Sequence, residues 1–334
     1  MSTLLFALAF CIVAVLVYMG RYSGRLRVAQ TRLIDAPIAE VFSAVADYRR
    51  WPAWNPWLEQ DAEGSMTCSE RSDQAGSSCA WNSEKWGSAS LVHKKLVAPL
   101  SIEQQLRFEQ PFRFSGRGDW QFVERAGKTE VSWRFKGRVG FALRAFAPTV
   151  QGMIALDFRY GLDRLGSLLE PEEAPRYTLS CLGLREIPAR RYVYSTYEGG
   201  LSGIAAAMRS GYAELRRQMA QLGLAASGEP IAVYLKTNVK LRTTVCLLGI
   251  PVGDAEVRSL PLREMPAHLA YVLRLRGAYG ALEIAWYQAM QRLRSENIQP
   301  DQRTPPFEVY LNDADAVGAN DTLTEVHIPV RRPA

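Results

Sequence analysis

A duplicated motif in the second half of the chain limits the folds that this sequence can adopt. The hexapeptide Leu184–Ala189 (LREIPA) returns 78 residues later as Leu262–Ala267 (LREMPA). The tripeptide Ile250–Val252 (IPV) returns at the same offset as Ile328–Val330. Two motifs that recur at one offset indicate an internal duplication, in which each repeat is one supersecondary unit that its neighbour completes.

The two expected repeats, residues 176–252 and 255–331, share one order of hydrophobic patterns: strand, turn, strand, helix, strand, strand. Each LRE-x-PA motif supplies the turn between the first two strands, because its proline interrupts the strand pattern. Each IPV motif closes the last strand. In the second repeat the first strand is expected over Glu256–Leu262 and the helix bears apolar residues at helical spacing. The pattern predicts one unit, made of two strands, a helix and two further strands, built twice.

Composition excludes several classes of function. The net charge of +6 is a thin excess of 40 basic over 34 acidic residues, without a basic run that contains aromatic residues, so we expect no nucleic-acid partner. The sequence has no phosphate-binding glycine loop and its three histidines are far apart, so we expect no cofactor and no metal. The five cysteines form no CxxC pair. A Cys68–Cys79 disulfide is expected only if this part of the chain faces an oxidising compartment.

The first 20 residues contain no charged side chain and are apolar from Leu4 to Met19. Twenty helical residues span about 30 Å, the thickness of the hydrocarbon layer. A cleaved signal peptide is the alternative, but it would carry basic residues before the apolar run; here Arg21, Arg25 and Arg27 follow it. We therefore expect residues 1–20 to be a single-pass anchor in the inner (plasma) membrane, and the positive-inside rule predicts cytoplasmic domains.

The first expected domain, residues 28–170, changes its pattern twice. A short strand and a helix with one buried face lead into the loop Trp51–Trp57, which holds three tryptophans and two prolines. Alternating strands follow to about residue 140, and an amphipathic helix over 148–169 closes the domain. His93, beside Lys94 on a strand expected to face solvent, is not expected to be catalytic.

This α+β pattern resembles the helix-grip fold of the SRPBCC superfamily, which includes START-like and polyketide-cyclase-like proteins. The loop with Trp51, Trp54 and Trp57 and the closing helix around Gly161 carry the resemblance. It implies a deep apolar cavity between sheet and helix for a hydrophobic ligand. The candidates to line that cavity are Trp54, Trp57, Trp120 and Trp133, although most tryptophans in such a domain fill the core instead.

A short acidic linker with two prolines, residues 171–175, leads into the duplicated segment 176–331. This segment resembles the gyrase-inhibitor-like domain, the effector-binding domain of some AraC-type and MerR-type regulators. The resemblance rests on Arg263–Ala267, Gly277–Gly280, Val309–Asp313 and Thr324–Val330. It implies two βαββ modules related by a pseudo-twofold axis, with a ligand groove in which an acidic residue faces cationic aromatic ligands.

Glu325 is the predicted acidic residue of that groove, because it interrupts an otherwise buried strand and the first repeat has Leu247 at the matching position. A buried carboxylate is costly unless it meets a cation, and aromatic rings add cation–π attraction. The predicted aromatic ligand-binding residues are Tyr197, Tyr271, Tyr279 and Trp286.

Three functions follow, in order of preference. The first is a membrane-anchored sensor or carrier of hydrophobic or cationic amphiphilic ligands, since neither domain shows a nucleophile with its base. The second is a hydrolase or cyclase of small hydrophobic molecules, with Glu325 as general base and Tyr279 polarising the substrate. The third is an effector-binding regulator, although the sequence shows no helix-turn-helix segment of its own.

Overall fold

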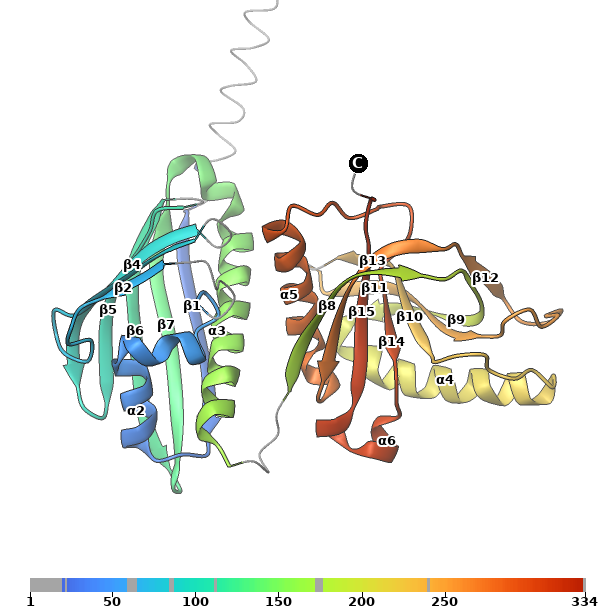
Figure 1. Cartoon of the computed structure of the whole chain (residues 1–334), viewed down its shortest axis with the longest axis horizontal. Helices are drawn as coiled ribbons and strands as arrows, with labels where there is room; N and C mark the ends of the chain where they lie inside the picture. The colour runs from blue at the N-terminus through green and yellow to red at the C-terminus, as the bar shows by residue number, and fades with distance from the viewer. Residues whose placement is uncertain are drawn as a thin grey trace, which may run out of the picture. The chain divides into compact units, whose positions relative to one another are not determined.

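The computed structural model describes residues 20–21, 23–58, 65–83, 87–110, 113–171, 177–238 and 241–332. The chain divides into unit 1 (Met1–Ala174) and unit 2 (Pro175–Ala334), each with its own sheet and core (Figure 1). Both units are α+β, as predicted. The predicted membrane anchor lies outside the described residues, apart from Gly20. No helix in the described part of the chain is both long and apolar enough to cross a membrane.

Within the described residues, unit 1 forms an antiparallel sheet in the order β1-β7-β6-β5-β4-β3-β2. The strands are β1 (Arg25–Ile34), β2 (Ser65–Cys68), β3 (Ser78–Ser83), β4 (Gly87–Val97), β5 (Ser101–Phe108), β6 (Phe114–Arg125) and β7 (Lys128–Val139). Burial alternates along them because successive side chains point to opposite faces. Cys68 lies opposite Cys79, and the two form a disulfide.

The helices of unit 1 pack on one face of this sheet (Figure 1). They are α2 (Ile38–Ala46), the 3-10 helices η1 (Tyr48–Ala53) and η2 (Phe141–Phe146), and the long α3 (Ala147–Leu169). Pro148 stands in the first turn of α3, where its missing N–H is not needed. Phe158, Leu162 and Leu165 of α3 are buried against the sheet, so the predicted closing helix is confirmed.

In the described part of unit 2, the sheet order is β12-β9-β11-β10-β14-β15-β13-β8. The first repeat contributes β8 (Thr178–Ile187), β9 (Arg190–Gly200), β10 (Ile231–Asn238) and β11 (Thr243–Pro251); the second contributes β12 (Leu262–Met265), β13 (His268–Arg276), β14 (Phe307–Tyr310) and β15 (Leu323–Pro329). The equivalent strands of the two repeats are β8 and β12, β9 and β13, β10 and β14, and β11 and β15. If each strand is replaced by its equivalent, the same strand order is obtained, read from the other edge of the sheet. The sheet therefore has a pseudo-twofold axis between β10 and β14.

Strand exchange between the repeats explains the duplicated motif. β8 pairs with β13 of the second repeat, and β12 pairs with β9 of the first. The turns at Pro188–Ala189 and Pro266–Ala267 are where the chain crosses from one half of the sheet to the other. Ile187 and Met265, which precede these turns, are buried in the same apolar cluster. The motif is thus structural, as the sequence indicated.

The two faces of this sheet are covered differently. Helix α4 (Ile204–Gln221), which follows the 3-10 helix η3 (Leu201–Gly203), packs against β9 and β11. Helix α5 (Leu282–Ser295), which follows η4 (Tyr279–Ala281), packs against β13 and β15. The short α6 (Ala314–Val317) and η5 (Ala319–Asp321) join β14 to β15. We call the side of α4 and α5 the helix face, and the other side the turn face.

One expected strand is shorter than the pattern indicated. The prediction placed it over Glu256–Leu262, but β12 begins only at Leu262. Pro261 lacks an N–H for the ladder, and Arg258 forms a local ion pair with Glu256 instead of joining the sheet.

Candidate ligand-binding site

A buried carboxylate lies at the pseudo-twofold axis of unit 2. Glu308 of β14 pairs with Ala232 of β10 across the axis and is 1% exposed. Phe307 and Val309 belong to the apolar cluster on the turn face, so alternation directs Glu308 to the helix face, as it does Tyr310. No described residue forms an ion pair with Glu308.

Three neutral groups donate hydrogen bonds to this carboxylate. The indole Nε1–H of Trp286, on α5, lies 2.5 Å from Oε1. The hydroxyl of Tyr310 lies 2.5 Å from Oε2, and Tyr234 donates a third bond. Burial raises the pKa of Glu308, and these three bonds offset part of that rise. These donors supply the hydrogen bonds that water would otherwise make to the carboxylate. They do not screen its negative charge as bulk water does, so the site favours the binding of a cation.

Aromatic rings from both repeats surround the carboxylate. Tyr234 meets Trp286 edge to face at 5.4 Å, and Tyr310 contacts Tyr212 at 6.0 Å and Tyr279 at 5.6 Å between ring centroids. Burial, with the Glu308 charge as a lesser cause, raises the pKa values of the Tyr212, Tyr234 and Tyr310 hydroxyls well above 10. These phenols therefore remain neutral donors. We call these five rings with Glu308 the Glu308 cage.

Three rings of the cage are partly exposed, since Tyr234 and Trp286 are half-buried and Tyr279 is more exposed than either. Tyr279 is 39% exposed at the start of α5, whereas Tyr212 and Tyr310 are each 8% exposed. The hydroxyl of Tyr310 also lies 3.3 Å from the sulfur of Met208 on α4. The methionine side chain is flexible and polarisable. The cage thus contains or contacts residues of both α4 and α5.

Glu325, the carboxylate predicted from the sequence, has a different environment. It lies on the turn face, because Val326 and Ile328 pack on the α5 side. Arg274 donates to Oε1 at 2.7 Å, and His327 Nε2 lies 2.9 Å from Oε2. The hydrogen bond from His327 is the main cause that lowers the pKa of Glu325. Burial lowers the pKa of His327, so the imidazole is a neutral donor in this pair.

The four predicted aromatic residues separate into two groups. Trp286 and Tyr279 belong to the Glu308 cage. The hydroxyl of Tyr271 instead contacts Cys181 Sγ at 2.8 Å and donates to Glu296 at 3.1 Å. The hydroxyl of Tyr197 donates to the backbone oxygen of Gly200. The structure therefore does not bring these four residues together around Glu325.

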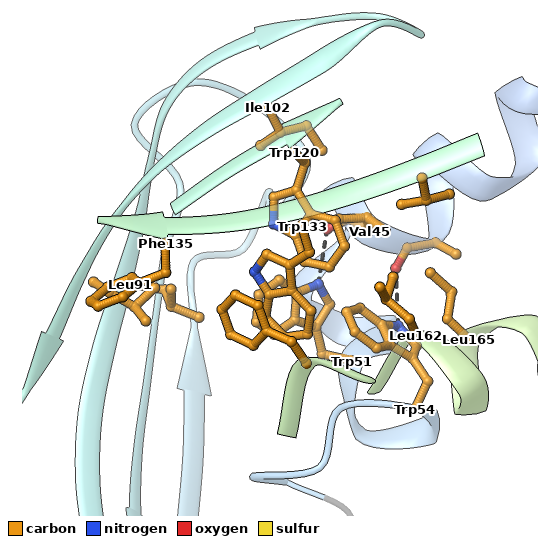
Figure 2. Packing of buried hydrophobic residues seen from close by; sticks show 14 of the residues in the cluster. Val45, Trp51, Trp54, Leu91, Ile102, Trp120, Trp133, Phe135, Leu162 and Leu165 are labelled. Atoms are coloured by element: carbon orange, nitrogen blue, oxygen red, sulfur yellow. Dashed lines mark hydrogen bonds between the residues drawn. The ribbon is translucent and has the colours of Figure 1, made fainter. Parts of the chain in front are cut away.

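The predicted cavity residues of unit 1 belong to one aromatic cluster, in which Trp54, Trp120 and Trp133 are labelled in Figure 2. Trp133 stacks on Phe158 of α3 at 3.7 Å and on Trp120 at 4.3 Å. Trp54 and Trp120 are fully buried, and only Trp57 is half-buried, with its Nε1–H donating to Asp157. In this structure these side chains occupy the space between sheet and α3 where the resemblance implied a cavity.

His93 is buried rather than on a solvent-facing strand, which corrects the expectation from its lysine neighbours. Its ring stacks on Tyr48 at 4.1 Å, and its Nε2 lies 2.8 Å from the backbone oxygen of Ala46. Gln104 links Nδ1 to Trp120, whose Nε1–H donates to Gln104 Oε1 at 3.0 Å. Burial lowers the pKa of His93, so it is a neutral structural residue. Among the residues described, no group of three or more metal-ligating side chains could hold a metal ion.

Comparison with protein families matches both halves of the chain. Residues 25–170 match the model for polyketide cyclase/dehydrase and lipid transport, and residues 184–331 match the GyrI-like small-molecule-binding domain. The chain joins a polyketide-cyclase-like domain to a GyrI-like domain. Both resemblances drawn from the sequence are thereby confirmed. A search of curated proteins found no significant match.

Solved structures similar to this chain include the following three. Protein CV1439 from Chromobacterium violaceum is 16% identical, with 44% of this chain and 98% of that chain covered and a TM-score of 0.36. The C-terminal domain of EcmrR is 18% identical (47% and 99% covered, TM-score 0.38). SAV2435, solved bound to tetraphenylphosphonium, is 14% identical (47% and 94% covered, TM-score 0.37).

Glu308 of the GyrI-like domain was not among the residues predicted from the sequence. A usable signal was present: in Phe307–Leu311 the glutamate is flanked by apolar residues on both sides, typical of a strand buried on both faces. Glu308 has no acidic counterpart in the first repeat, but the 78-residue offset does not show which residue is its structural counterpart, because it aligns Glu308 with Pro230. The sheet register instead aligns Glu308 with Ala232.

Proposed function

We propose that this protein is a membrane-anchored binding protein, a sensor or carrier, whose GyrI-like domain takes up cationic aromatic small molecules at the Glu308 cage. The observation that carries the proposal is the buried Glu308 carboxylate, which has three neutral donors and forms no ion pair with any residue that the structure describes. A cation in the cage would gain charge attraction to Glu308 and cation–π contacts with Trp286 and the tyrosines. A neutral ligand of the same shape would gain only apolar burial.

Tetraphenylphosphonium and tetraphenylborate provide the test, because they share size and shape and differ in the sign of their charge. We expect the cation to raise the melting temperature of the full chain and the anion to leave it unchanged. At a hundredfold excess over Kd, binding to the native state adds about 2.7 kcal/mol, which corresponds to several degrees. Equal shifts with both ions would mean that apolar burial dominates and would defeat the proposal.

The same cage makes catalysis the second candidate. A carboxyl group with a raised pKa beside buried tyrosine hydroxyls is suited to general acid–base chemistry on a bound substrate. Glu325, the base first predicted, is less suited, since its lowered pKa makes it a weaker base. Mass spectrometry of ligands recovered after incubation separates the candidates, because a sensor or carrier returns them unchanged. The regulator candidate shares the binding prediction and needs a partner that contacts DNA.

The anchor and its orientation are part of the proposal: residues 1–20 span the membrane, and the arginines that follow retain the domains in the cytoplasm. The Cys68–Cys79 disulfide makes this orientation testable, because disulfides persist in oxidising compartments and are rare in the cytosol. Because the structure pairs these two cysteines, the proposed cytoplasmic orientation requires that the disulfide be absent in the cell: acid-trapping and alkylation of intact cells should then show both thiols reduced, with Cys181 as the free-thiol reference. A disulfide in trapped cells would reverse the orientation.

A further inference from the structure

One end of the polyketide-cyclase-like domain exposes aromatic side chains among basic ones. Phe141 and Phe146 of η2 are 43% and 57% exposed. The guanidinium of Arg144, between them in sequence, lies 4.8 Å from the centroid of the Phe141 ring. Exposed phenylalanines lose apolar burial, so a surface that retains them indicates a contact that the isolated domain does not satisfy.

Basic residues lie opposite one another at the same end of the sheet. Arg25 of β1 pairs with Arg138 of β7, and Arg27 pairs with Lys136. All four side chains are exposed, and none forms an ion pair with a residue that the structure describes. Like charges directly opposite each other destabilise a sheet. Two such pairs of basic residues at one end of the sheet indicate that an anionic partner from outside the domain neutralises their charge.

The two chain segments that carry these aromatic and basic residues contain no acid. Residues 21–34 and 131–156 contain neither aspartate nor glutamate. The backbone N–H of Val139 donates to the oxygen of Gly24, and a Cβ on Gly24 would meet the Arg144 side chain at 2.8 Å. The start of β1 and η2 are therefore held together, a few residues after the apolar segment 1–20 ends.

We propose that this end of the domain, the η2 surface of Phe141, Phe146, Arg144, Arg25 and Arg138, rests on an anionic phospholipid surface. Aromatic rings are favoured at the membrane–water interface, and basic side chains are attracted to anionic headgroups within a Debye length. The inference rests on the proposed anchor, which delivers this end of the domain to the bilayer. The contact fixes the orientation of the domain relative to the bilayer, which the anchor alone would not do.

Photo-crosslinking of the full chain in vesicles tests the contact. p-Benzoylphenylalanine replaces Phe146 in one protein and Leu100 in the other. Leu100 is 55% exposed and lies in the β4–β5 turn, at the opposite end of the sheet. In vesicles of phosphatidylcholine with phosphatidylglycerol, we expect lipid adducts at position 146 to exceed those at position 100 by roughly fivefold or more, and to fall with added salt.

Two comparisons decide the outcome. The double variant Arg25→Glu/Arg138→Glu should lower the adduct at position 146 severalfold without releasing the protein from carbonate-washed vesicles. Equal adducts at positions 146 and 100, or equal adducts in vesicles of phosphatidylcholine alone, would overturn the proposed surface. Loss of the protein on carbonate washing would instead show that residues 1–20 do not anchor it, whichever position crosslinks.

Discussion

Glu308→Gln is expected to weaken the binding of tetraphenylphosphonium strongly while the GyrI-like domain stays folded. Glutamine retains the size of the side chain but removes the charge that attracts the cation. Loss of a buried charged partner costs about 2–3 kcal/mol, which weakens binding roughly 30-fold or more. Isothermal titration calorimetry with tetraphenylphosphonium measures this loss directly. Undiminished affinity in the variant would remove Glu308 from the site.

The same substitution should not destabilise the domain at neutral pH. Because burial raises the pKa of Glu308 in the native state above the usual 4.5, the stability that its protonated form contributes is fully present below pH 4.5. That contribution is lost as the pH rises through the native pKa. Glutamine mimics the protonated form, so the variant should melt at an equal or higher temperature at pH 7. Melting curves of both proteins between pH 4 and 8 check this.

Glu325→Gln is the matched control, and its expected behaviour is the reverse. Its pKa is lowered in the native state, so its stabilising contribution is present above pH 4.5 and is lost as the pH falls through the native pKa. Removing the charge leaves Arg274 and His327 without their partner, at a cost of about 1–3 kcal/mol at pH 7. Binding should survive. If binding is lost here and retained in Glu308→Gln, the site lies at Glu325.

Trp133→Ala is expected to produce the largest loss of stability in the polyketide-cyclase-like domain. The side chain is 3% exposed and stacks on Trp120 (Figure 2) and, on its other side, on Phe158 of α3. Truncating a buried aromatic residue to alanine costs about 3–5 kcal/mol, which includes the cavity that it leaves. Urea unfolding followed by circular dichroism measures the change, and Trp133→Phe, which keeps a stacked ring, should lose much less.

The outcome also distinguishes packing from ligand binding in that domain. If Trp133 fills the core, the alanine variant should be partly restabilised by indole, which fits the vacated space. If Trp133 lines an existing ligand cavity, as the family resemblance implied, the variant should retain its stability and change only its affinity for hydrophobic ligands.

Much of the architecture was predictable because it depends on local patterns. The closing helix expected over 148–169 is Ala147–Leu169, since its apolar residues repeat at helical spacing. The duplicated LRE-x-PA motif marked both turns of the GyrI-like domain, because a proline there interrupts any strand. The two prolines of residues 171–175 fall beside the division between the two units. Each of these features is decided by residues within a few positions of one another.

Partners across the sheet were not predictable in the same way. Alternation shows that Glu325 and Glu308 each lie in a strand, but it does not show what lies opposite. Arg274, which neutralises Glu325, is 51 residues away along the chain, and Trp286, which donates to Glu308, is 22 residues away on another element. The pairing of β13 with β15 places Arg274 opposite Glu325. A carboxylate becomes a paired structural group or an unpaired site according to its neighbours in space, and only the tertiary structure decides which neighbours it has.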